Sequence, residues 1–154
     1  MTVTIRLAES AWDIALCCRL VNQLTPELTH DYKNAFEKFK ATIQRNPDYF
    51  LWVAELTDGD RDIVGTAMMH LQHKLSYHCG VAAHLEDVVV DKGYRGKGIG
   101  KVLVAKAIAT AKEHGCYKIM LTCFEKTIPY YKAQGFQTHD FGMRLNLKTD
   151  LYPQ

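Results

Sequence analysis

The sequence feature that most constrains the fold is a glycine-rich turn between a hydrophobic strand and an amphipathic helix. Val88-Val-Val90 is a β-branched run typical of a strand, and the turn Tyr94-Arg-Gly-Lys-Gly-Ile-Gly100 follows it. Residues 98–114 then carry apolar side chains at helical spacing, with Gly115 as a stop, and residues 117–123 predict a buried strand. Such a strand-helix-strand unit requires a crossover connection, and therefore parallel pairing of its two strands.

The remaining apolar patterns predict that the rest of the sheet is antiparallel. Trp12, Leu16 and Leu20 keep a helical interval in a first helix over residues 9–23, which Ser10 can cap. The other expected elements are a second helix that ends before Pro47, strands at 49–56, 63–71 and 83–90, a short helix at 128–134, and one or two final strands at 136–147. The order ααβββαβαβ indicates an α/β fold of the α+β type, in one domain over residues 1–154.

Length, composition and charge narrow the function classes. The chain has 154 residues, 47% of them hydrophobic, which suits a single core. Its formal net charge of +2 is spread along the chain, so no basic block demands a nucleic-acid partner. The first residues form no apolar signal region, and no stretch approaches the roughly 18 apolar residues of a membrane span. We therefore expect a cytoplasmic protein with no nucleic-acid and no membrane partner.

Cysteine and histidine residues do not form a recognised metal site. The five cysteines are an odd set without C-x-x-C spacing, so reduced core thiols are expected. His70, His73, His78 and His84 lie close together in the sequence, but the odd spacing of the first two puts them on opposite faces of a strand. No carboxylate or thiolate stands at a ligand interval from them. We expect no metal.

The glycine-rich turn is suited to a pyrophosphate. Its backbone N–H groups can close on an anion, the start of the following helix adds the positive end of its dipole, and Arg95, Lys97 and Lys101 add charge. A dinucleotide-binding fold is disfavoured because the turn lies two-thirds along the chain and the next strand ends in Thr122-Cys123 rather than an acidic residue. The G-x-x-x-x-G-K-[ST] pattern of phosphate-loop NTPases is missing.

The turn resembles the acetyl-CoA loop of the GNAT superfamily of N-acetyltransferases, whose pattern [RQ]-x-x-G-x-[GA] is met by Arg95-Gly-Lys-Gly98-Ile-Gly100. Within that superfamily the chain is most similar to glucosamine 6-phosphate N-acetyltransferases. The segments that carry this similarity are His84-Leu-Glu-Asp-Val-Val-Val90, Gly115-Cys-Tyr-Lys-Ile-Met-Leu121 and Glu125-Lys-Thr-Ile-Pro-Tyr-Tyr-Lys-Ala-Gln-Gly-Phe136.

The resemblance implies a fold, a cofactor and a partner. The GNAT fold has a mixed central sheet of about six or seven strands flanked by about four helices, and two splayed parallel strands form the acetyl-CoA cleft. The implied reaction is direct acetyl transfer to the amine of a small phosphorylated substrate, with glucosamine 6-phosphate first, and the implied assembly is a homodimer. The implied cofactor-binding residues are Asp87, Val88, Val89, Val90, Arg95, Gly96, Lys97, Gly98, Ile99, Gly100, Lys101, Thr127 and Tyr130.

Each chemical task of acetyl transfer has a candidate residue. The amine must lose a proton, and Glu86 is the candidate base, since alternation along a strand puts Glu86 and Asp87 on opposite faces. A backbone N–H near Val88 polarises the thioester carbonyl, and Tyr131 donates a proton to the departing sulfur, as the resemblance implies. The candidate substrate-binding residues are Thr25, Lys74, Glu86, Asp87, Thr122 and Arg144.

Departures from the family pattern leave other functions open. Thr122 stands where the sugar-phosphate enzymes usually have Asp, and Thr127 where they usually have Asn. The segment Met69-His-Leu-Gln-His-Lys-Leu75 is also similar to aminoalkylphosphonate acetyltransferases. The alternatives are therefore an aminoalkylphosphonate or other small-amine acetyltransferase, a protein or peptide acetyltransferase, and a non-catalytic acetyl-CoA-binding module.

Overall fold

The computed structural model describes residues 2–24, 32–43, 46–58, 62–145 and 147. The chain forms two compact units, Met1–Leu121 and Thr122–Gln154, which are described separately below. Of the helices in the described ranges, none has both the length and the apolar character that crossing a bilayer requires.

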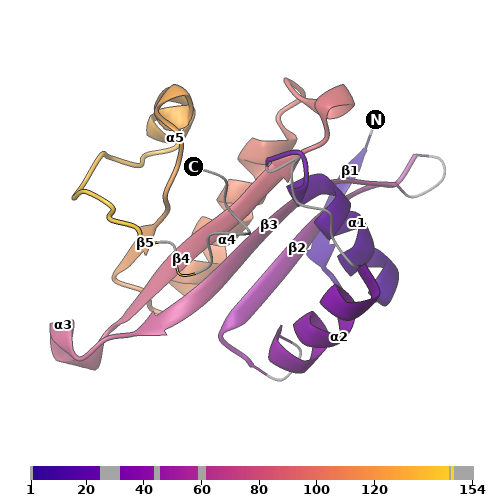
Figure 1. Ribbon diagram of the computed structural model, residues 1–154. Coiled ribbons are helices and arrows are strands. Elements are labelled where there is room, and N and C mark those ends of the chain that lie inside the picture. The colour runs from indigo at the N-terminus through magenta and orange to yellow at the C-terminus, as the bar shows by residue number, and fades with distance from the viewer. Residues whose placement is uncertain (1, 25–31, 44–45, 59–61, 146, 148–154) are drawn as a thin grey trace. The chain divides into compact units, whose positions relative to one another are not determined.

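The first unit consists of a five-stranded sheet and four α-helices (Figure 1). Its elements are β1 (Val3–Leu7), α1 (Ala11–Val21), α2 (Tyr32–Ile43), β2 (Tyr49–Leu56), β3 (Ile63–His73), α3 (Ser76–Cys79), β4 (Val81–Val90), the 3-10 helix η1 (Lys92–Tyr94), α4 (Ile99–Glu113) and β5 (Lys118–Met120). The second unit contains the 3-10 helix η2 (Glu125–Thr127) and α5 (Ile128–Lys132).

The sheet has the mixed pairing that the sequence predicts. Its strand order is β1-β2-β3-β4-β5, with antiparallel pairing from β1 to β4. The β4–β5 pair is parallel and is connected through α4, which confirms the predicted crossover. The parallel pairing joins Ala82, Ala83 and His84 to Lys118, Ile119 and Met120.

The predicted number of strands is wrong. The described sheet has five strands rather than six or seven. The described residues form five α-helices rather than about four, and the four-residue α3 among them has positive φ values at Tyr77 and His78. The strand β1 was not predicted, and no strand forms at 136–145 or at 147. Apolar residues alternate along that last segment as in a strand, but Phe141, Met143, Leu145 and Leu147 are between 82% and 101% exposed. Without a neighbouring strand, alternation cannot form a ladder.

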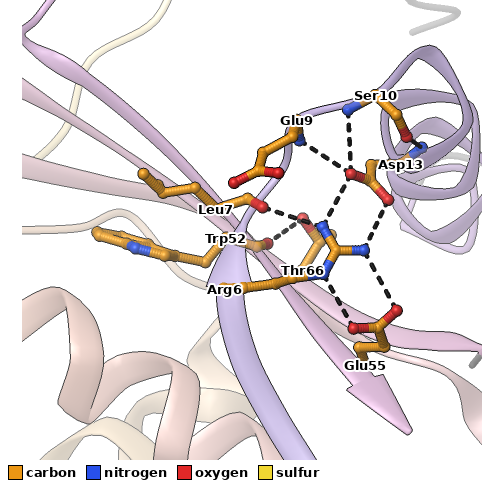
Figure 2. A network of polar contacts seen from close by, with 8 residues as sticks. All are labelled: Arg6, Leu7, Glu9, Ser10, Asp13, Trp52, Glu55 and Thr66. Atoms are coloured by element: carbon orange, nitrogen blue, oxygen red, sulfur yellow. Dashed lines mark hydrogen bonds and ion pairs between the residues drawn. The ribbon is translucent and has the colours of Figure 1, made fainter. Parts of the chain in front are cut away.

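The start of α1 is held by a polar network (Figure 2). Ser10 caps the helix through a capping box with Asp13, which confirms the predicted cap. Asp13 is also paired with Arg6 of β1, at 2.9 Å between Nη1 and Oδ2, and Arg6 in turn binds Glu55 of β2 at 3.0 Å. The network therefore ties the first turn of α1 to two strands.

Helices cover both faces of the sheet. In Figure 1, α1 and α2 lie side by side, with α4 across the sheet from them. Leu16, Cys17 and Leu20 of α1 pack into one buried cluster with residues of β2, β3 and β4. The helical spacing also suggested an inward Trp12, but this side chain is 70% exposed.

The opposite face is packed against α4. The predicted stripe of Ile99, Leu103, Ala107 and Ala111 is buried, as expected from its spacing. Gly65 of β3 lies under this helix: a Cβ added there would stand 3.2 Å from the Leu103 Cδ1 atom. The absence of a side chain at Gly65 therefore lets α4 approach the sheet closely.

Candidate active site

A β-bulge interrupts β4 at the acidic pair. Thr66 pairs with Val89 and Met68 pairs with Glu86, so Asp87 and Val88 together oppose a single residue of β3. Asp87 has a φ of +51°, in the left-handed region that a β-strand does not use. Such unusual backbone conformations gather at functional sites.

The bulge places Glu86 and Asp87 on the same face of the sheet. Glu86 shares its register position with Met68, which packs against the cluster under α1. Asp87 lines a cavity on that same face, together with Thr66 and Met68. The prediction that the two carboxylates face opposite ways is therefore wrong, because the extra residue breaks the strand's alternation.

The cavity lies between α1, α2 and the sheet. It measures about 340 Å³ and is lined mainly by apolar side chains, among them Ile14, Val21 and Phe39. Asp87 borders it at the sheet and Cys18 borders it at α1. Partial burial, followed by the neighbouring Glu86 charge, raises the pKa of Asp87 above its ordinary value. A protonated amine beside these two carboxylates would relieve their mutual repulsion.

A row of rings runs across the sheet beside Glu86. Tyr49 of β2 stacks on His70 of β3 with centroids 5.4 Å apart, and His70 stacks on His84 of β4 at 5.2 Å. His84 Nδ1 lies 3.8 Å from the Glu86 Oε1 atom. Burial lowers the pKa of His84, and the nearby His70 lowers it further, so the ring is neutral at neutral pH.

The glycine-rich turn leads into an open helix start. Gly96 and Gly98 have φ values of +76° and +82°, which glycine adopts without a steric penalty. Gly98 is the N-cap of the 15-residue helix α4, and no described side chain caps that end. The free N–H groups and the positive end of the helix dipole therefore suit an anion such as a pyrophosphate.

Side chains stabilise this turn through hydrogen bonds and a cation–π contact. The Asp91 Oδ1 atom accepts a 2.9 Å hydrogen bond from the Gly93 N–H, and its Oδ2 accepts one from Gln23 at 3.1 Å. Arg95 donates from Nε to the Val90 carbonyl at 3.0 Å. The Lys97 ammonium sits over the Tyr94 ring, 4.8 Å from its centroid. Arg95 and Lys97 are exposed, so both can also meet a ligand.

The pairing of β4 with β5 covers only three residues of each strand. Beyond His84 and Met120, the described residues 85–90 of β4 have no neighbouring strand on that edge. Free main-chain groups on this edge can bind an extended ligand in the way a strand would. Val88 and Val90 are half-buried there, whereas the Val89 and Ile99 side chains are buried in the core. Val89 and Ile99 can thus contribute only backbone groups.

In the second unit, Tyr131 lies in a small aromatic cluster. Its ring makes edge contacts with Tyr130 and Phe136, with centroids 5.0 and 5.8 Å away. Burial, and after it the proximity of Tyr130 and Cys123, raises the pKa of Tyr131 to about 12. The phenol therefore stays protonated at physiological pH and is able to donate a proton.

The sequence profile of the Acetyltransferase (GNAT) family matches residues 9–136. The chain belongs to this family. It is 42% identical over 85 residues to glucosamine 6-phosphate N-acetyltransferase of Trypanosoma brucei brucei, which covers 55% of this chain and 58% of that protein. It is 30% identical over 129 residues to glucosamine 6-phosphate N-acetyltransferase 1 of Dictyostelium discoideum, covering 84% and 81% of the two chains. The match thus spans little more than half the trypanosome protein's length.

A solved structure confirms the GNAT fold. The crystal structure of glucosamine-6-phosphate N-acetyltransferase from Arabidopsis thaliana superposes with a TM-score of 0.84 and 28% identity, over 96% of this chain and 100% of that one. The family resemblance inferred from the glycine-rich turn and the three flanking segments is therefore confirmed.

The remaining predicted residues of this GNAT chain are spread over both units. Lys74 follows β3, is half-buried, and lies near enough to His84 to lower the pKa of that ring. Gly100 and Lys101 are in the first turn of α4. Thr25 lies outside the described residues. In the second unit, Thr122, Thr127, Tyr130 and Arg144 are positioned only relative to their own neighbours.

Three of those second-unit residues have defined contacts or exposure. The Thr127 hydroxyl donates to the Phe124 carbonyl at 2.7 Å, so it stabilises the turn η2. The side chain of Arg144 is exposed. Thr122 is likewise exposed.

Sequence reasoning missed the bulge and the row of rings. It considered His70 and His84 only as metal ligands, and no group of three or more His, Cys, Asp or Glu side chains able to hold a metal forms in the described ranges. Their stacking depends on the β3–β4 register, which no local pattern encodes. The one available signal was the even spacing of His84 and Glu86, which puts them on one face.

Proposed function

We propose that this protein is an acetyl-CoA-dependent N-acetyltransferase that acetylates the primary amine of glucosamine 6-phosphate, giving N-acetylglucosamine 6-phosphate. The observation that carries the proposal is the architecture of β4. Its bulge puts the carboxylates of Glu86 and Asp87 on one face, its outer edge is free, and the turn that follows it leads into a helix start with no described side-chain cap. The relatives that bear the name of this activity support the choice of substrate.

The cofactor fits the residues that follow β4. The pyrophosphate of acetyl-CoA is proposed to bind the N–H groups from Gly96 to Gly100, with Arg95, Lys97 and Lys101 nearby. The pantetheine arm is proposed to run along the free edge of β4, where Val88 and Val90 offer main-chain groups. No side chain beyond glycine suits residues 96 and 98, because both have positive φ values.

The chemical steps are assigned to four groups. Glu86 accepts a proton from the substrate ammonium. Asp87 beside it favours binding of the amine in its cationic, protonated form. A backbone N–H at the bulge, near Val88, donates to the carbonyl oxygen as negative charge develops on it. Tyr131, which stays protonated because burial raises its pKa to about 12, donates its phenolic proton to the thiolate that leaves.

The phosphate and the assembly complete the proposal. Lys74 is proposed to bind the substrate phosphate, together with Arg144, whose planar guanidinium can make a bidentate contact.

We also propose a homodimer formed through the C-terminal segment. Four alternating apolar side chains are exposed there, and a second copy of the chain would cover them: Phe141, Met143, Leu145 and Leu147.

The test is a thiol-release assay with acetyl-CoA against glucosamine 6-phosphate, 2-aminoethylphosphonate, glucosamine and a lysine peptide. The proposal expects turnover of glucosamine 6-phosphate above the other three amines, and lower turnover in a Lys74→Gln variant. Lys112→Gln, which changes the exposed last turn of α4, is the matched control. Turnover of only the phosphonate or the peptide would overturn the substrate, and tight acetyl-CoA binding with no turnover would overturn the activity.

A further inference from the structure

His84 lies beside Glu86, the proposed base, and is partly exposed to solvent. His84 stands between Glu86, 3.8 Å from its Oε1 atom, and His70, whose ring is stacked 5.2 Å away. The His84 side chain is 30% exposed, and that of Glu86 is 46% exposed. A group in this position can exchange protons with Glu86 on one side and with water on the other.

The proton balance of the proposed reaction requires that one proton leave the site. An ammonium carries three N–H bonds and the amide product keeps one, so two protons leave the nitrogen as the C–N bond forms and the C–S bond breaks. One of them balances the proton that Tyr131 gives to the thiolate. The other proton must be released to solvent. If it stayed on Glu86, that residue could not accept a proton in the next turnover.

We infer that His84 takes this proton from Glu86 and releases it to solvent, so that it acts on the substrate only through Glu86. The inference rests on the proposed function. The Nδ1–Oε1 distance of 3.8 Å exceeds a direct hydrogen bond, and one bridging water or a small rotation of the Glu86 side chain closes it. The proton then moves from the Glu86 carboxyl to the His84 imidazole, and from the imidazolium to water.

The groups around His84 keep its ring neutral, so that it has a free nitrogen to accept a proton. His70 of β3, Lys74 after β3 and Lys118 of β5 all disfavour the imidazolium, and Glu86 alone favours it. Burial acts in the same direction as these three groups and is the largest effect, so the pKa of His84 lies below its ordinary value. The imidazolium is therefore short-lived at neutral pH, which suits transfer to water.

The test compares His84→Gln with the wild type on whichever amine the wild type acetylates. We expect kcat to fall about tenfold or more, KM for acetyl-CoA to stay unchanged, and millimolar imidazole to restore turnover in the variant. The contribution of the imidazole to the acidic limb of the wild-type pH profile should also disappear, while the contribution of Glu86 remains. His73→Gln is the control, since His73 is 65% exposed and contacts Asp48 at 3.2 Å instead.

A second variant keeps the inference testable if His84→Gln does not fold. His70→Gln leaves His84 in place but removes a neighbour that lowers its pKa, so the acidic limb should move to higher pH. An unmoved limb overturns the relay. So does a folded His84→Gln variant with wild-type kcat, or one whose loss imidazole does not restore. A wild type that turns over no amine overturns the proposed function itself, which is a separate outcome.

Discussion

Replacing Asp13 with Asn should destabilise the first unit by about 3 kcal/mol, because Asp13 is the buried member of a partly buried charge pair and the substitution removes its charge. Asp13 accepts four hydrogen bonds (Figure 2). Its Oδ2 receives Arg6 Nη1 at 2.9 Å and the Glu9 and Ser10 N–H groups at 2.9 and 3.1 Å, and its Oδ1 receives Arg6 Nη2 at 2.9 Å. The side chain is only 5% exposed.

An asparagine amide can replace only one of those oxygens. If its carbonyl takes the place of Oδ2, its NH2 group faces the Arg6 Nη2 donor, and one charge-assisted bond of about 1.5–3 kcal/mol becomes a clash of donors. Arg6 keeps Glu55 as a partner at 3.0 Å, which limits the loss. The midpoint of thermal unfolding should fall by roughly 6–12 °C for a chain of this size.

Urea unfolding at pH 7 measures this difference, with Asp62→Asn as the control because Asp62 is exposed. The pH dependence gives an independent check. The hydrogen bonds from Arg6 hold the pKa of Asp13 far below its ordinary value, so its stabilisation is present above about pH 4 and is lost as pH falls further. The gap between wild type and variant should narrow in acid. A gap below about 0.5 kcal/mol at pH 7, or one that does not change with pH, would refute the reasoning.

Three further predictions follow from the packing and the turn geometry. Gly65→Ala should lower the free energy of unfolding by about 1–3 kcal/mol in urea titrations, because the new Cβ would stand 3.2 Å from the buried Leu103 Cδ1 and the Val89 carbonyl; an unchanged value would contradict this. Gly98→Ala should lower the free energy of unfolding by about 1 kcal/mol and raise KM for acetyl-CoA, because Gly98 has a φ of +82°, which strains alanine even where space is free. Gly93→Ala, as the control, should change neither value. Tyr131→Phe should lower kcat about 100-fold at unchanged KM for acetyl-CoA, with Tyr117→Phe as the control; equal kcat values would exclude the proton-donor role.

Local rules predicted the parts of the fold that depend on local sequence. The Ser10 cap, the buried stripe of α4 and the positive φ of Gly115 at its end were all confirmed, because capping and helical periodicity act within a few residues. The strand β1 is only five residues long and gains its ladder from β2, so its own pattern is weak.

The site depends on contacts that are distant in sequence. Counting alternate residues along β4 failed at Asp87 because the bulge arises from a mismatch with β3, which the sequence of β4 alone does not display. The glycine-rich turn was found because Gly96, Gly98 and Gly100 lie within five residues of one another in the sequence. The ring row was not, since Tyr49, His70 and His84 come from three strands.

We expect that Glu86, which lies beside the bulge of β4, is the base for acetyl transfer to glucosamine 6-phosphate. The most direct test measures the N-acetylated sugar phosphate by mass spectrometry alongside thiol release, for the wild type and for Glu86→Gln. We expect equal amounts of thiol and acetylated product from the wild type, and a kcat about 100-fold lower in the variant at unchanged KM for acetyl-CoA. Wild-type kcat in the variant, or thiol release without acetylated product, would contradict the account.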